Sequence, residues 1–172
     1  DLNKTLIFFG VCPAYSLFPA VAHRLDEYLQ ATTISLARDH ILVHLRLTPG
    51  VDGAEDIIRQ IDQNGDGILS APEQQAYVLR VLRTLSLCID GHAGHLLVEN
   101  AVFPAIPALK AGAGVIDLQI GMKTSLQHGT YRLTYHNQGT SHETAWFVNC
   151  LMPRDPALHV TRQRRSEDQS FY

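Results

Sequence analysis

The sequence predicts an α+β fold: a β-sandwich of about seven or eight antiparallel strands with a helix–loop–helix inserted after the first hairpin. Two patterns predict it. Apolar and polar residues alternate along most of the chain, which is typical of half-buried strands, whereas residues 51–85 have helical spacing around a polar loop. The chain has 172 residues, of which 45% are hydrophobic and 18% are charged. This is the balance of a globular protein that can bury a core without a metal or a disulfide.

Residues 1–22 have the pattern of a signal peptide. Lys4 precedes the apolar run 6–18, and Ala20-Val-Ala22 is a small-x-small pattern of the kind that signal peptidase cleaves. The mature chain would begin at His23 in an exported protein, periplasmic or extracellular. A buried N-terminal helix is the alternative interpretation.

The remaining residues, 23–172, are predicted to form a single domain. The sequence starts without Met, and it ends at Ser170-Phe-Tyr172 with no polar tail after a strand-like run. We therefore expect it to be a fragment of a longer chain.

Residues 28–48 are predicted to form a β-hairpin. A first alternating segment begins at Tyr28, the turn 37–40 follows, and a second alternating segment ends before Pro49-Gly50. One face of the second segment carries Ile41, Val43, Leu45 and Leu47.

Residues 51–85 then change to helical periodicity. Apolar residues recur at helical spacing up to Ile61 and again from Tyr77, and the polar loop 62–73 lies between them. The pattern predicts a helix, a loop and a second helix.

Short alternating segments separated by turn residues follow the second helix. They predict the remaining strands of the sandwich. These segments are 85–89, 95–103, 115–122, 130–136, 144–151 and 158–164.

The loop 62–73 carries the most specific motif in the chain. It reads Asp-Gln-Asn-Gly-Asp-Gly-Ile-Leu-Ser-Ala-Pro-Glu and matches D-x-[DN]-x-[DN]-G-x5-E at every defined position. This segment resembles the EF-hand family, and the resemblance implies one bound calcium ion. Oxygen atoms at this spacing suit calcium, which takes about seven such ligands. The expected ligands are the side chains of Asp62, Asn64, Asp66, Ser70 and Glu73 and the backbone carbonyl of Ile68.

The residues that flank the loop agree with this interpretation. Gly67 permits the sharp turn, and Ser70 and Glu73 have the spacing of a capping box for the second helix. Leu69 is the apolar residue expected to pack back onto the domain. The alternative is an Asx-rich turn that joins two helices without an ion.

We found no second loop of this kind, which argues against a calmodulin-like sensor. Exported calcium modules bind at roughly 10⁻⁴ to 10⁻³ M, where the ion is abundant. We therefore expect a calcium ion that stabilises an exported, non-catalytic binding module or ectodomain.

Charge and motif content exclude other functions. The formal net charge is −3, and the Lys and Arg residues are scattered, so we expect no nucleic-acid partner. The sequence has no G-x-S-x-G, no H-E-x-x-H and no glycine-rich phosphate loop. We therefore predict that the domain is not an enzyme.

Histidines support an alternative function from a different class. His92-Ala-Gly-His95 crosses a turn, and a mature His23 would add an α-amino group beside its imidazole. These residues would suit a module that delivers nickel, cobalt or copper to a membrane transporter. The competing interpretation is that the histidines are ordinary polar residues.

A second resemblance rests on His23-Arg-Leu-Asp-Glu-Tyr28 and Leu151-Met-Pro-Arg-Asp-Pro156. These segments are similar to extracytoplasmic N-terminal domains of bacterial membrane proteins grouped with nickel/cobalt transporters and hydrogenase/urease accessory proteins. The resemblance implies a transmembrane part after Tyr172 or a membrane partner, and it assigns no functional residue.

Cys88 and Cys150 are the two cysteines that remain after residue 22. An oxidising compartment would allow them to pair. They would otherwise be two small hydrophobic residues on strands. The sequence leaves both alternatives open.

Overall fold

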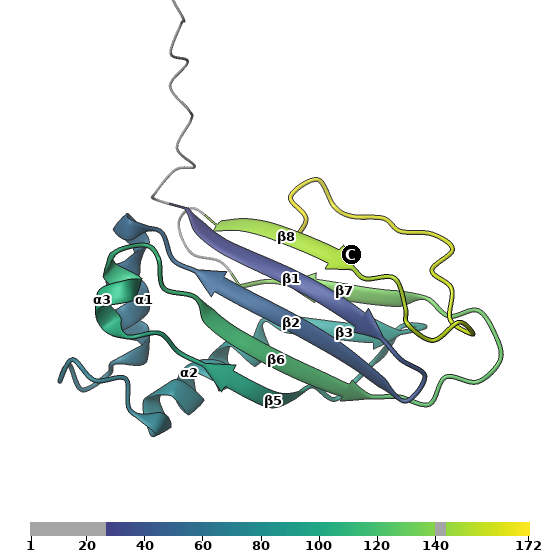
Figure 1. Cartoon of the computed structure of the whole chain (residues 1–172), viewed down its shortest axis with the longest axis horizontal. Helices are drawn as coiled ribbons and strands as arrows, with labels where there is room; N and C mark the ends of the chain where they lie inside the picture. The colour runs from purple at the N-terminus through teal and green to yellow at the C-terminus, as the bar shows by residue number, and fades with distance from the viewer. Residues whose placement is uncertain (1–26, 140–143) are drawn as a thin grey trace, which may run out of the picture.

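The computed structural model describes residues 27–139 and 144–172 (Figure 1). The predicted signal peptide 1–22 and His23 lie outside these residues. Strands and helices are mixed in the described part, in agreement with the predicted α+β class. In chain order, the elements are β1 Tyr28–Leu36, β2 His40–Thr48, α1 Val51–Ile61, α2 Ala71–Arg83, β3 Leu85–Ile89, β4 His92–Ala93, β5 Leu97–Val102, α3 Ile106–Lys110, β6 Ile116–Lys123, β7 Leu133–Asn137 and β8 Thr144–Cys150.

The strands form a five-stranded sheet, in the order β5-β6-β2-β1-β8, and a three-stranded sheet, in the order β4-β3-β7. All neighbouring strands are antiparallel except β1 and β8, which are parallel, with Gln30 opposite Trp146. The prediction of an all-antiparallel framework is therefore wrong at this edge. Alternation along a strand specifies its buried face, but it does not specify the direction of the neighbouring strand.

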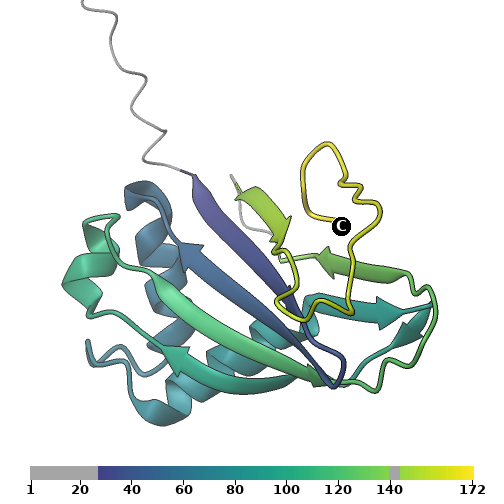
Figure 2. The same ribbon diagram turned by 45° about the vertical axis from the view of Figure 1, so that its right-hand side comes forward.

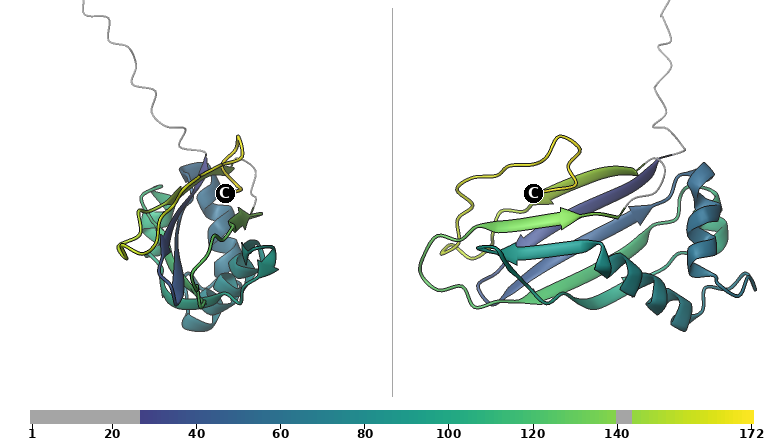
Figure 3. Two further views of the ribbon diagram at one scale, coloured as in Figure 1. Left: turned by 90° about the vertical axis from the view of Figure 1, so that its right-hand side faces the viewer. Right: turned by 180° about the vertical axis from the view of Figure 1, so that it is seen from behind.

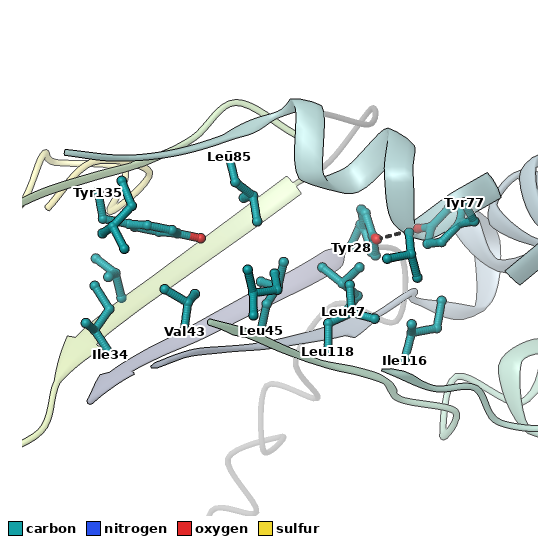
Figure 4. Packing of buried hydrophobic residues seen from close by; sticks show 14 of the residues in the cluster. Tyr28, Ile34, Val43, Leu45, Leu47, Tyr77, Leu85, Ile116, Leu118 and Tyr135 are labelled. Atoms are coloured by element: carbon teal, nitrogen blue, oxygen red, sulfur yellow. Dashed lines mark hydrogen bonds between the residues drawn. The ribbon is translucent and has the colours of Figure 1, made fainter. Parts of the chain in front are cut away.

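The predicted hairpin 28–48 is confirmed, and its alternation gives the buried face of the large sheet. In β1, β2 and β6, buried residues alternate with half-buried or exposed ones. Figure 4 shows these inward side chains meeting residues of the small sheet and of α2. Tyr135 of β7 illustrates the contact, because its Oη lies 3.0 Å from Oγ1 of Thr32 in β1. Side chains of both sheets thus belong to one hydrophobic core.

The two long helices lie where the sequence predicts them, between β2 and β3. The buried side of α1 carries Ala54, Ile57, Ile58 and Ile61, and α2 buries Tyr77 and Val78. In Figures 1 and 2 the helices gather at one end of the large sheet, and the right-hand view of Figure 3 shows the loop between α1 and α2 projecting from that end. No helix among the described residues is long and apolar enough to cross a membrane.

The C-terminal part of the chain differs most from the prediction. The expected strand 158–164 is not formed, and most of its residues are exposed. Instead, the last residues extend the small sheet at the edge of β7. Tyr135 and Tyr172 exchange two backbone hydrogen bonds of 2.7 and 2.8 Å. Arg162 and Arg164 follow Leu158 and Val160 in the same register, so the apolar alternation of the expected strand stops after Val160.

Candidate metal centre

The predicted EF-hand loop connects α1 to α2 without a break. Asp62 is the C-cap of α1, and Ser70 is the N-cap of α2. Gly65 and Gly67 have φ of 71° and 78°, in the left-handed region. A Cβ atom at either position would meet nothing within 4 Å, so there is room for a side chain. Glycine is favoured at both positions because of the left-handed backbone conformation alone.

Asp62 closes the first half of the loop. Its Oδ1 accepts a hydrogen bond of 2.8 Å from the backbone N–H of Gly65, and its Oδ2 accepts one of 2.9 Å from that of Gly67. The carboxylate at the first motif position therefore sets both left-handed turns. Local hydrogen bonds of this kind are the reason that Asp is favoured in turns.

Asn64 and Asp66 form the tip of the loop. Oδ1 of Asn64 accepts a hydrogen bond of 2.9 Å from the backbone N–H of Asp66, and Nδ2 of Asn64 donates one of 3.0 Å to Oδ2 of Asp66. Oδ1 of Asp66 accepts one of 2.8 Å from the backbone N–H of Ile68. The two side chains are thus paired at the end of the molecule, where both residues are exposed.

Glu73 links the start of the loop to the start of α2. Its Oε1 accepts hydrogen bonds from the backbone N–H groups of Gln63 (2.9 Å) and Asn64 (3.3 Å). Its Oε2 accepts bonds from the backbone N–H and from Oγ of Ser70, at 3.0 and 2.6 Å. The predicted capping box is therefore confirmed. The bond from the Ser70 hydroxyl is the largest of the effects that lower the pKa of the Glu73 carboxyl below its ordinary value.

Contacts on the domain side fix the loop to its helices. Leu69 is half-buried and packs against the core, as predicted, and its carbonyl accepts a hydrogen bond of 2.6 Å from Nε2 of Gln74. Arg80 of α2 donates to the carbonyl of Gln60 in α1. Ile68, in contrast, is 65% exposed.

The structure brings all six predicted ligand residues into one loop, but it does not gather them around a point. No group of three or more His, Cys, Asp or Glu side chains in the described part of the chain is placed to hold a metal ion. The carboxylates turn to backbone N–H groups instead, and the carbonyl of Ile68 accepts a 3.0 Å bond from the backbone N–H of Ser70. The donor set does fit a hard cation, because every candidate ligand atom is oxygen.

The histidines singled out from the sequence do not form a site within the described residues. His92 and His95 are both exposed, and neither belongs to a metal-holding group there. Two other histidines of β2 have carboxylate partners on other strands of the large sheet. Nε2 of His44 lies 2.8 Å from Asp117 on the neighbouring β6, and Nε2 of His40 lies 3.7 Å from Glu99 on β5, beyond β6. Sequence reasoning missed both pairs because they depend on strand register.

Cys88 and Cys150 are free thiols in this structure. Cys150 is buried in the large sheet, and burial raises the pKa of its thiol. Cys88 lies on β3 in the small sheet, in alternation with the buried Leu87. The two residues therefore belong to different sheets.

The chain was then compared with protein-family models, curated proteins and solved structures. None of them matches. The resemblance of the loop to EF-hands therefore rests on its own sequence motif.

Proposed function

We propose that this domain binds one calcium ion in the loop 62–73. The side chains of Asp62, Asn64, Asp66, Ser70 and Glu73 and the carbonyl of Ile68 would hold the ion. The ion would stabilise an exported, non-catalytic module.

The hydrogen bonding of Asp62 and Glu73 is the observation that carries the proposal. These carboxylates stand at the first and last motif positions, and each already bends the backbone of the loop toward itself. Each carboxylate oxygen has two lone pairs, so an oxygen that accepts one N–H bond retains capacity for a cation. The Glu73 carboxyl is ionised at neutral pH even at its ordinary pKa, and the hydrogen bonds from Ser70 lower that pKa further.

The all-oxygen donor set supports a hard cation over a transition metal. Calcium and magnesium prefer oxygen, whereas nickel and copper are better served by imidazole. The candidate ligands are three carboxylates, including that of Glu73, together with one amide, one hydroxyl and one backbone carbonyl. This is a set of oxygen ligands of the kind that calcium takes in proteins. Transition-metal delivery remains the rival proposal, and it would depend on His23, His92 and His95.

The position of the loop suggests what the ion does. It lies between two helices that join β2 to β3, that is, between a strand of the large sheet and a strand of the small one. We therefore describe the domain as a two-sheet sandwich with an inserted EF-hand, in which calcium holds the connection rigid. The pattern of residues 1–22 supports placing this module outside the cytoplasm.

Thermal unfolding with calcium and with a chelator tests this function. Calcium is expected to raise the melting temperature of the wild type, because a ligand that binds only the folded state stabilises it. The Asp62→Ala variant should not respond. Asp56→Ala is the matched control, since Asp56 is an exposed carboxylate of α1 that pairs with Arg59 outside the loop. A response to nickel but not to calcium would favour the rival.

A further inference from the structure

The outward face of the large sheet carries a row of polar side chains that crosses all of its strands. Strand register places Asn149 of β8 opposite Thr33 of β1, and Thr33 opposite His44 of β2. His44 is opposite Gln119 of β6, which is opposite Asn100 of β5. Residues opposite one another point to the same face, so these five side chains form one line of roughly 19 Å.

The row contains hydrogen-bonding groups but no lysine, arginine or carboxylate. Asn149 and Asn100, at its ends, are exposed, and the three residues between them are half-buried. Amides and hydroxyls both donate and accept hydrogen bonds. The single titratable member, His44, already has a partner in Asp117 at 2.8 Å.

One end of the row opens into a shallow hollow of about 360 Å³. Thr33 and Asn149 contribute to its lining together with Phe147, whose side chain is 51% exposed on the same face. The C-terminal segment supplies Arg165 and Gln169 as a wall.

The wall of the hollow is held in place by specific bonds. Arg165 donates a hydrogen bond of 3.1 Å to Oδ1 of Asn149, which leaves the Nδ2 group of that amide as a donor. Gln169 has φ of 58°, an uncommon conformation for this residue type. Its neighbours fix it, because the carboxylate of Asp168 accepts hydrogen bonds from Ser166 and Ser170 on either side.

We infer that this face binds a neutral oligosaccharide, with one sugar ring against Phe147 in the hollow and the chain along the polar row. Sugar hydroxyls both donate and accept hydrogen bonds, as the side chains of the row do, whereas a carboxylate ligand only accepts them. An exposed aromatic ring supplies an apolar surface for the C–H face of a sugar. The inference goes beyond calcium binding and does not depend on it.

Side-chain amide NMR spectra of the ¹⁵N-labelled full chain test the inference. The probes are maltotetraose, cellotetraose and chitotetraose, with tetraglycine and tetraglutamate as peptide controls. At least one saccharide is expected to shift the amide signals of Asn149, Gln119 and Asn100. No saccharide-induced shift, shifts confined to residues outside the row, or shifts with the peptides only would overturn it.

Two variants locate the binding. Phe147→Ala should weaken the affinity for the active saccharide about tenfold, the scale of a lost aromatic anchor. Phe171→Ala is the matched control, because Phe171 is also an exposed phenylalanine but packs against His136. Gln119→Ala, which changes no apolar contact in the hollow, should weaken affinity several-fold. Equal affinities in wild type, Phe147→Ala and Gln119→Ala would contradict the inference.

Discussion

Oη of Tyr28 lies 3.0 Å from Oη of Tyr77, so the first residue of β1 is hydrogen-bonded to the helix that leaves the candidate calcium loop. Both side chains are buried. Tyr77 also packs edge-on against Phe103, with ring centroids 6.0 Å apart, and Arg80 lies over its ring at 5.6 Å. The orientation of α2, and therefore of the loop, is tied to the core through this pair (Figure 4).

Tyr77→Phe is expected to destabilise the domain by about 1–3 kcal/mol, because it leaves the buried hydroxyl of Tyr28 without this partner. Urea denaturation measures the change in the free energy of unfolding. Tyr131→Phe is the control: the hydroxyl of Tyr131 accepts a bond from the backbone N–H of Gln127, but at an exposed position. If both variants lose the same free energy of unfolding, the buried Tyr28–Tyr77 hydrogen bond contributes no more to stability than the exposed one.

Alkaline pH should unfold the domain through its buried tyrosines. Burial raises the pKa of Tyr135 to about 12 and raises the pKa of Tyr28 and Tyr77 above their ordinary value. Below pH ~10 these groups are protonated in both states, so their contribution to stability is fully present there. Above pH ~10 the tyrosines of the unfolded chain lose their protons before the buried ones do, which favours unfolding. The contribution of Tyr135 to the free energy of unfolding is therefore lost as the pH rises toward 12.

The loss should amount to roughly 1.4 kcal/mol per pH unit for each such tyrosine. Urea denaturation between pH 8 and pH 12 measures it, and phenolate absorbance follows ionisation directly. Tyr135→Phe should reduce the slope. A slope that is the same in this variant would mean that Tyr135 ionises equally readily in both states.

Two glycines with different backbone conformations should respond in opposite directions to alanine. Gly67 lies at φ 78° in the loop, so Gly67→Ala is expected to cost about 1–2 kcal/mol. Gly53 lies in α1 with nothing within 4 Å of an added Cβ, so Gly53→Ala should stabilise by about 0.5–1 kcal/mol. Thermal unfolding of both variants measures these changes, and a shift of the same sign in both would contradict the account of the loop backbone.

Local patterns of the sequence predicted those parts of the fold that depend on neighbouring residues. The alternation in 28–48 and the helical spacing on either side of the loop are local, and both predictions are confirmed. Helix α3 and strand β4 are too short to produce a period. The parallel pairing of β8 with β1 joins residues more than a hundred positions apart, so no local pattern specifies it.

In the candidate site, too, the sequence predicted what depends on local spacing and not what depends on side-chain conformation. The motif specified the residues of the loop and its capping box, because both are properties of spacing. It did not specify that the carboxylates of Asp62 and Asp66 turn toward backbone N–H groups, since rotamers depend on competing hydrogen bonds. The polar row from Asn149 to Asn100 could not be seen in the sequence, because it exists only through the register of five strands.

Isothermal titration calorimetry with calcium tests the central claim most directly. The chelator-stripped wild type and the Asp56→Ala control are expected to bind one calcium ion each, and Asp62→Ala is expected to lose that binding. Glu73→Gln, which keeps the size of the side chain but removes its charge, should weaken binding at least about tenfold. Binding that is unchanged in Asp62→Ala, or no calcium binding by the wild type, would contradict the claim that the loop 62–73 is a calcium site.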